Sequence, residues 1–286
     1  MDLRRLIIPL MIEQFLNSLM GMADTMMVSR AGEAAISAVS LVDAVNILIT
    51  QVFTALATGG TIICAQYIGR QDKKESIRAA RQVVWTVFVI SMAISIICVA
   101  FRRPLLALIF GKVEKAVMTN SITYMWITAC SFPFIALFQA GAAFFQASGD
   151  SRFPMTVSVI SNIINIVGNA ILIFGLLGFP ALGIQGAAIG TLCARMTETL
   201  IVLIYAHFMN QDVKIRPRFM IQIDRVLAKD YLIYAMPVVL NEMMWGLGVS
   251  ANTAVIGHLW SAAVASNSVA QVARQLAQVV VFGIAN

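Results

Sequence analysis

The fold follows from residues 153–194, which read FPMTVSVISNIINIVGNAILIFGLLGFPALGIQGAAIGTLCA and contain no Asp, Glu, Lys or Arg. A helix that crosses a lipid bilayer needs about 20 consecutive, mostly apolar residues. Only helices and closed barrels satisfy their backbone hydrogen bonds inside a bilayer, and barrel strands are short and alternate apolar with polar residues. We therefore predict two transmembrane helices in this region, over residues 153–175 and 183–208.

The composition of the whole chain agrees with this local pattern. Of its 286 residues, 59% are hydrophobic and 12% are charged, whereas about 25% of the residues of an ordinary soluble domain are charged. So few charges cannot cover the surface of a soluble protein of this size. A soluble enzyme, a secreted disulfide-stabilised domain and a disordered chain are therefore excluded.

We predict an all-α polytopic membrane protein with about eight transmembrane helices in this chain. Their expected ranges are 6–28, 36–63, 83–101, 121–147, 153–175, 183–208, 231–256 and 262–285. The fourth helix contains Pro133, which removes a backbone hydrogen bond and predicts a kink.

Lys and Arg residues lie mainly in the connections between the apolar segments. An excess of these residues on one side of the membrane sets the orientation of a polytopic protein, and here it predicts a cytoplasmic N-terminus. The net charge of +6 therefore reflects membrane topology and does not indicate a nucleic-acid partner. The lipid bilayer is the expected environment, and we expect a monomer.

The beginning of the chain is repeated near its end. Pro9 aligns with Pro237 without a gap, and Gln14 then aligns with Glu242. Six predicted helices separate the two copies, so both copies cross the membrane in the same direction. Parallel repeats of six-helix halves are an architecture of membrane transporters.

This repeat predicts two six-helix lobes and about 12 helices in all. The N-terminal lobe would span residues 1–210, and residues 211–230 would form a cytoplasmic linker. Residues 231–286 would be the first two helices of the second lobe. We therefore expect the chain to be incomplete at its C-terminal end.

Three polar residues lie on one face of the first predicted helix. Asn17 and Asp24 follow Glu13 by 4 and 11 residues, and three helical turns contain about 11 residues. A charged side chain at mid-membrane costs about 2.5–3.5 kcal/mol, so such residues usually face other helices or a water-filled cavity. Glu13 has a simpler interpretation as a residue that pairs or reaches the interface. Asp24 has no basic residue one turn away, which favours a functional role.

Other predicted helices also carry polar stripes. Asn162, Asn165 and Asn169 lie on one face of the fifth helix, and Arg195 can pair with Glu198 on the sixth. These patterns have a second interpretation, as contacts that only hold neighbouring helices together. The residues that we expect to line a substrate cavity are Glu13, Asn17, Asp43, Asn46, Asn162, Arg195, Glu198 and Glu242.

The sequence carries no motif of an ATP-driven pump or a hydrolase. A glycine-rich phosphate loop, HExxH and GxSxG are all absent. We find no nucleophile–base pair or metal cluster at the expected membrane depth, so we predict neither an enzyme nor a bound cofactor. A transport cycle would therefore use a gradient of H⁺ or Na⁺.

Four short motifs are spread over the predicted helices. They are MADTMMV at residues 22–28, AQYIGR at residues 65–70, NIVGN at residues 165–169 and GIQGAAIGT at residues 183–191. In this combination they resemble the multidrug and toxic compound extrusion (MATE) family. Within that family the chain is most similar to the bacterial DNA-damage-inducible-like branch.

The resemblance implies two lobes that face each other across a V-shaped cavity in a bacterial cytoplasmic membrane. It implies an antiporter that exports cationic or amphipathic drugs while H⁺ or Na⁺ enters. The cation site that the motifs carry over consists of Asp24, Asn165, Asn169 and Thr191, the first three being the ligands if the ion is Na⁺. Many family members have an acid where Asn169 stands, which leaves the choice between Na⁺ and H⁺ open.

Two other functions stay open at this point. A lipid-linked oligosaccharide flippase of the same superfamily would need cationic residues to hold a pyrophosphate, and the N-terminal lobe offers mainly Arg195. The second alternative is a fragment that does not transport, because four of the twelve expected helices are not in this chain.

Overall fold

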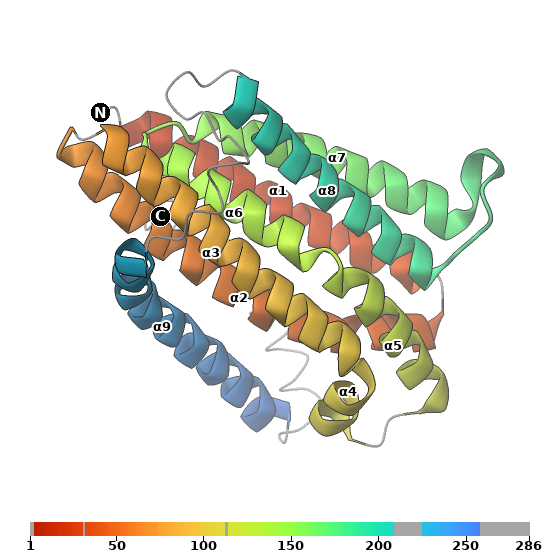
Figure 1. Ribbon diagram of the computed structural model, residues 1–286. Coiled ribbons are helices and arrows are strands. Elements are labelled where there is room, and N and C mark those ends of the chain that lie inside the picture. Colours follow the sequence, from red (N-terminus) through yellow and green to blue (C-terminus); the bar gives the residue numbers. More distant parts are fainter. Residues whose placement is uncertain (1–2, 31, 72, 112–113, 209–224, 258–286) are drawn as a thin grey trace.

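The computed structural model describes residues 3–30, 32–71, 73–111, 114–208 and 225–257, and its regular elements there are all helical (Figure 1). The helices are α1 (Leu3–Ser29), α2 (Glu33–Gly69), α3 (Lys73–Ala100), α4 (Arg102–Phe110), α5 (Lys115–Ala129), α6 (Phe132–Ala147), α7 (Arg152–Phe174), α8 (Ile184–Phe208) and α9 (Arg225–Gly257). A short 3-10 helix, η1 (Leu176–Gly178), follows α7. The predicted all-α class is confirmed, and the predicted segment 262–285 lies outside the described residues.

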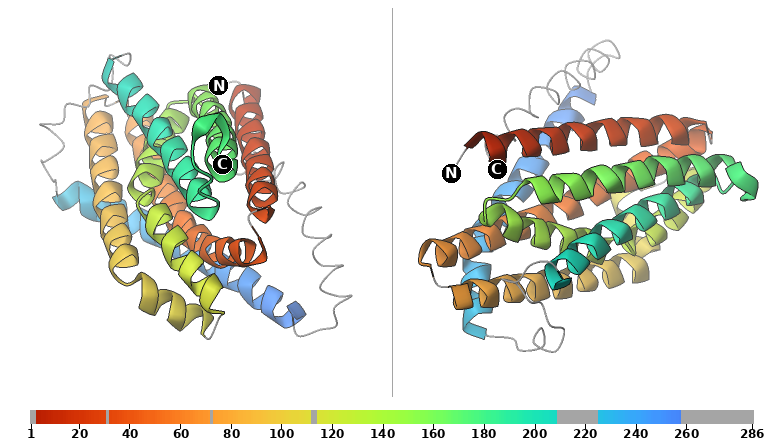
Figure 2. Two further views of the ribbon diagram at one scale, coloured as in Figure 1. Left: turned by 90° about the vertical axis from the view of Figure 1, so that its right-hand side faces the viewer. Right: turned by 90° about the horizontal axis from the view of Figure 1, so that it is seen from above.

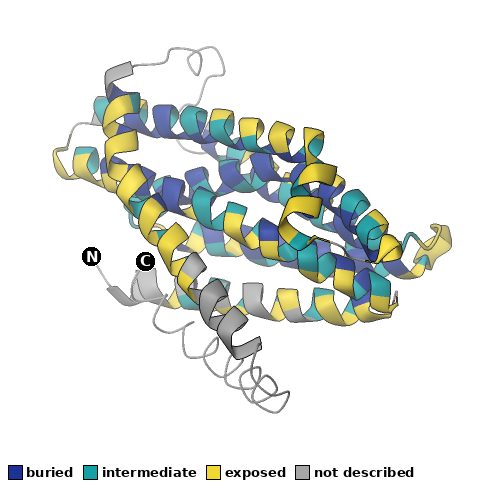
Figure 3. Ribbon diagram, turned by 90° about the horizontal axis from the view of Figure 1, so that it is seen from below, coloured by how far each residue is buried: buried dark blue, intermediate teal, exposed yellow. Residues whose placement is uncertain are grey.

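Four helices of the described part are long and apolar enough to cross a membrane, or five if the bent pair α5 and α6 counts as one span. The four are Glu33–Gly69, Glu75–Ala100, Arg152–Phe174 and Ile184–Ala206. Exposed residues lie on the outward faces of the bundle (Figure 3), and they include Ile96, Ile163 and Ile204, each more than half exposed. A large apolar surface of this kind suits contact with lipid. The chain is a multi-pass membrane protein.

The predicted kink in the fourth span is confirmed. Helices α5 and α6 are bent by 41° at a break between Ala129 and Phe132. The Ser131 hydroxyl donates a hydrogen bond to the Thr128 carbonyl at 2.6 Å, which satisfies a backbone group at the break. Pro133 lies in the first turn of α6, where its missing N–H has no helical partner to lose. The span begins at Lys115, earlier than expected, and α4 occupies part of the expected connection.

Helix α2 lies at the centre of the bundle, where it packs against α1, α3, α5, α6 and α9. On one side of it α7 packs along α8, and α1 lies along α7 (Figures 1 and 2). In the apolar core the rings of Phe53 and Phe132 meet edge to face, with centroids 6.0 Å apart. The packing therefore brings together α1, α2, α7 and α8, the helices on which the sequence places its polar stripes.

Two glycines let α7 and α8 approach closely. Gly186 and Gly190 are four residues apart on α8, a spacing of small residues that is common between transmembrane helices. A Cβ atom at Gly186 would lie 2.6 Å from the backbone of Leu172, and one at Gly190 would overlap the side-chain oxygen of Asn169. The glycines therefore set the distance between these helices and leave room for Asn169.

Helix α9 packs on α2 through a buried tyrosine and a close backbone contact. The Tyr231 hydroxyl donates to the Leu56 carbonyl at 2.7 Å, and a Cβ atom at Gly59 would lie 2.7 Å from Ala235. Pro9 in α1 and Pro237 in α9, which the sequence alignment pairs, both lie inside long helices. Because α9 begins at Arg225, the end of the expected linker is helical.

Candidate functional site

Three of the four predicted cation-site residues, Asp24, Asn169 and Thr191, line a cavity of about 190 Å³, which we call the Asp24 cavity. Its walls come from α1, α2, α5, α6, α7 and α8. The polar side chains that line it are Asp24, Thr25, Asp43, Asn46, Thr50, Tyr124, Thr128, Ser131, Asn169, Thr191 and Arg195. Residues of α1 and α8, which are far apart in the sequence, thus meet at one place.

A chain of hydrogen bonds connects the four predicted cation-site residues. The Asn169 amide donates to Asp24 Oδ1 at 2.8 Å and to Asn165 Oδ1 at 3.2 Å. The Asn165 amide donates in turn to the Thr191 hydroxyl at 3.2 Å, and Thr191 donates to the Ala187 carbonyl. The polar face of α7 is therefore turned toward α1 and α8, and Asp24 is held by a neutral amide.

The Asn169 side chain offers a further oxygen at this site. Its residue is 1% exposed, and its Oδ1 atom is buried without a hydrogen-bond partner among the described residues. Carboxylate and amide oxygens are suitable ligands for a hard cation. The pair Asp24 and Asn169 therefore offers oxygen ligands of the kind that Na⁺ binds, and Asp24 alone can take up a proton.

A second carboxylate lines the same cavity. Asp43 accepts hydrogen bonds from the Asn46 amide at 3.3 Å and from the Tyr124 hydroxyl at 3.4 Å. Asp43 and Asn46 were both predicted to line a cavity. Tyr124 was not predicted, because nothing in the pattern of its own span marks it as different from a core aromatic residue.

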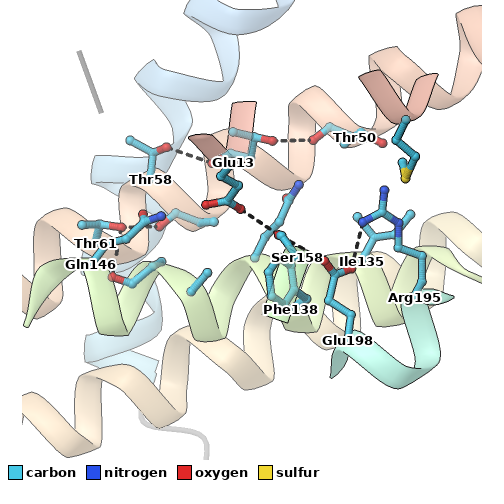
Figure 4. A pocket seen from close by; sticks show the side chains of 16 residues that line it. Glu13, Thr50, Thr58, Thr61, Ile135, Phe138, Gln146, Ser158, Arg195 and Glu198 are labelled. Carbon is cyan, nitrogen blue, oxygen red and sulfur yellow. Dashed lines mark hydrogen bonds and ion pairs between the residues drawn. The ribbon is translucent and has the colours of Figure 1, made fainter. Parts of the chain in front are cut away.

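A larger cavity of about 370 Å³, which we call the Glu13 cavity, lies next to the first one along the bundle. In it the Ser158 hydroxyl lies 3.0 Å from Glu13 Oε1 and 3.4 Å from Glu198 Oε1 (Figure 4). Glu198, 1% exposed, forms an ion pair with Arg195 at 2.8 Å. Arg195 lines both cavities, so the two sites share one cationic side chain.

The remaining predicted cavity residues are placed differently. Asn162 is buried on α7 and lines neither cavity. Glu242 lies on α9 and also lines neither cavity. The side chain of Asn17 lies outside the described residues. The assignment of these three residues to a substrate cavity stays a prediction.

A family model described as MatE matches residues 9–171, more than half of the chain. The chain belongs to the MatE family. Over 196 residues it is 33% identical to the uncharacterized transporter YisQ of Bacillus subtilis, covering 68% of this chain and 43% of YisQ. Over 217 residues it is 29% identical to the probable multidrug resistance protein NorM of Thermotoga maritima, covering 75% of this chain and 46% of NorM.

Solved structures agree with this assignment to MatE. A crystal structure of MATE in complex with MaD3S has a TM-score of 0.89 and 25% sequence identity, covering 99% of this chain and 63% of that chain. A MOP superfamily transporter from Pyrococcus furiosus has the same fold, with a TM-score of 0.87 and 24% identity. The MatE chain described here spans about half the length of the curated relatives that it matches.

Proposed function

We propose that this MatE protein exports cationic or amphipathic drugs across a bacterial cytoplasmic membrane, in exchange for H⁺ or Na⁺. In this proposal residues 1–210 form the N-terminal lobe, with the N-terminus in the cytoplasm. Residues 211–230 link it to a second lobe that begins near residue 231. The names of relatives support the drug-export part, since they include a multidrug resistance protein of Pseudomonas aeruginosa and two probable ones.

The observation that carries the proposal is the way Asp24 is held. Its carboxylate lines a cavity and accepts a hydrogen bond from Asn169, a neutral group. Arg195 lines the same cavity, but its guanidinium is bound to Glu198. A carboxylate in a membrane without a bound basic partner is costly to keep charged. A transported cation that visits Asp24 would remove this cost.

Cation binding would change the contact between α1 and α7. When a proton neutralises Asp24, the hydrogen bond from Asn169 loses its charge-assisted character and weakens. When Na⁺ binds instead, the Asn169 oxygen can coordinate the ion. In either case the contact between Asp24 on α1 and Asn169 on α7 differs between the loaded and the empty site. This difference can couple ion binding to a change in the conformation of the protein.

The flippase alternative receives no support from the side chains around the cavities. Among the described residues that line them, Arg195 is the one cation. Its positive charge is already balanced by Glu198, so it offers little net charge to a pyrophosphate. We therefore do not propose lipid-linked oligosaccharides as substrates.

The test is the Asp24→Asn variant, expressed from the natural gene in a drug-sensitive bacterium. The amide keeps the size of the side chain but cannot take up a proton and has no negative charge to attract Na⁺, so ethidium efflux should fall to the level of the empty host. Asp230→Asn is the matched control, because Asp230 is exposed on α9. Efflux driven separately by a pH gradient and by a Na⁺ gradient identifies the ion. Unchanged efflux by Asp24→Asn at equal expression contradicts the proposal.

A further inference from the structure

The Glu13 cavity has an unbalanced charge. Two carboxylates, Glu13 and Glu198, share it with one guanidinium, and Arg195 is bound to Glu198 at 2.8 Å. The hydroxyl of Ser158 lies within hydrogen-bond distance of both carboxylates, at 3.0 Å and 3.4 Å. A hydroxyl has a single proton to donate. Glu198 has Arg195 as its counter-charge, whereas Glu13 has a hydroxyl that it shares with Glu198. The Glu13 Oε2 atom has no hydrogen-bond partner among the described residues.

A row of threonines on α2 adds further acceptors to this cavity. Thr54, Thr58 and Thr61 line it. Each hydroxyl donates its proton to the carbonyl four residues earlier, at 3.0, 3.0 and 3.2 Å. Because a hydroxyl keeps two lone pairs after it donates, these oxygens can only accept further hydrogen bonds. The wall formed by α1 and α2 is thus negative and rich in acceptors.

The wall from α6 is mostly apolar. Ile135, Phe138, Ala142 and Ala143 line the cavity from this helix, and Gln139 and Gln146 add two side-chain amides. Its volume of about 370 Å³ is near the lower end of the 300–1,000 Å³ that is usual for small-molecule sites. A ligand that matches both walls has a small apolar body and a cationic head that donates hydrogen bonds.

We propose that the Glu13 cavity selects organic cations that carry N–H donors, such as protonated amines, amidines and guanidines, over quaternary ammonium ions of similar size. The ammonium or amidinium head lies between Glu13 and the threonine row, and the apolar body lies against Ile135 and Phe138 of α6. A quaternary head supplies the charge that Glu13 requires but leaves the threonine oxygens without a donor. The inference rests on the proposed export of organic cations and names the class that this site prefers.

The test uses four ligands that keep one positive charge but lose N–H donors one by one. They are benzylammonium, its N-methyl and N,N-dimethyl derivatives, and benzyltrimethylammonium. Binding to the purified chain in lipid nanodiscs is measured by calorimetry. We expect benzylammonium to bind about tenfold more tightly than benzyltrimethylammonium, with the others between them. Apolar burial alone predicts the opposite order, because each methyl group adds apolar area.

Two variants separate the contributions of charge and hydrogen bonding. Glu13→Gln should weaken all four ligands by about tenfold or more, since each has the same charge. Thr58→Val should reduce the preference for benzylammonium by roughly threefold and leave benzyltrimethylammonium unchanged. Thr156→Val is the matched control, because Thr156 on α7 donates to the Arg152 carbonyl in the same way and lines neither cavity.

The outcomes distinguish this inference from the function on which it rests. Affinity that rises with methylation, or a preference that Thr58→Val leaves undiminished, overturns the selectivity and leaves the export of organic cations standing. If the chain binds none of the four benzylammonium ligands and no ethidium, the proposed function is overturned together with the inference.

Discussion

The two cavities of this MatE protein hold their carboxylates in different ways. In the Glu13 cavity, Glu198 is 1% exposed and forms an ion pair with Arg195 at 2.8 Å. In the Asp24 cavity, Asp24 and Asp43 are held by neutral groups, the amides of Asn169 and Asn46 and the hydroxyl of Tyr124. Glu198 thus has a cationic partner, whereas the partners of Asp24 and Asp43 are neutral.

This difference indicates a division between structure and exchange. A buried ion pair already has its counter-charge, so losing one partner is costly and a mobile cation gains little there. A carboxylate held by amides is fixed in position, but its negative charge has no permanent counter-charge and can therefore bind a mobile cation. Glu13 lies between the two cases, since it shares the hydroxyl of Ser158 with Glu198. Variants of Arg195 and Asp24 test this difference.

The largest effect on stability is expected for Arg195→Met. The variant leaves Glu198 buried without its cation, so the free energy of unfolding should fall by about 3–5 kcal/mol. Denaturation of the protein in detergent micelles, followed by tryptophan fluorescence, measures this change. The double variant Arg195→Met/Glu198→Met leaves no uncompensated charge in the pair, so it should recover most of the loss.

Asp24→Asn in the same measurement provides the contrast. Its amide can still bond to Asn169, so the free energy of unfolding should change by less than about 1 kcal/mol. If this variant lost as much stability as Arg195→Met, Asp24 would be a structural residue and the division between the two cavities would be wrong.

An intermediate effect is expected for Gly190→Ala. The added methyl group would overlap the side-chain oxygen of Asn169, and overpacking of this kind costs about 1–3 kcal/mol. Since Asn169 donates to Asp24, drug efflux should fall as well. The measurements are micelle denaturation and ethidium efflux in cells.

Gly168→Ala is the matched control for Gly190→Ala at the same interface. A Cβ atom at Gly168 would lie 3.7 Å from the Gly190 Cα, which is ordinary contact. Alanine also has a higher helix propensity than glycine, by about 1 kcal/mol. Gly168→Ala should therefore preserve both stability and efflux, and equal losses in the two variants would show that Asn169 is not the residue through which Gly190 acts.

Helical spacing was sufficient to predict which residues of one helix share a face. It placed Asn165 and Asn169 on one side of α7, and these residues do hydrogen bond to each other. Spacing within one helix carries no information about which helices meet. The contact of Asp24 with Asn169 across 145 residues of sequence could therefore be anticipated only from the family resemblance.

Residues that act through packing were harder to predict. Gly190 belongs to a quoted motif, but its role depends on the position of Asn169 on another helix. Tyr124 lies in an apolar span and matters because α5 passes close to Asp43 on α2. The shared hydroxyl of Ser158 likewise becomes informative only when α1 and α8 are both present beside α7.

A smaller effect than that of Gly190→Ala is expected for Tyr124→Phe, which removes one of two hydrogen bonds to Asp43. The variant should cost about 0.5–1.5 kcal/mol of unfolding free energy, and Tyr231→Phe, which removes the bond to the Leu56 carbonyl, should cost a similar amount.

The two variants should differ in transport. Asp43 lines the Asp24 cavity, so Tyr124→Phe should shift the H⁺ or Na⁺ concentration for half-maximal efflux by roughly threefold. Tyr231 lies at the contact of α2 with α9, away from that cavity, and its variant should leave the ion dependence unchanged. An equal shift in both variants would mean that the ion dependence reports general loosening of the bundle, and Asp43 would then have no part in holding the cation.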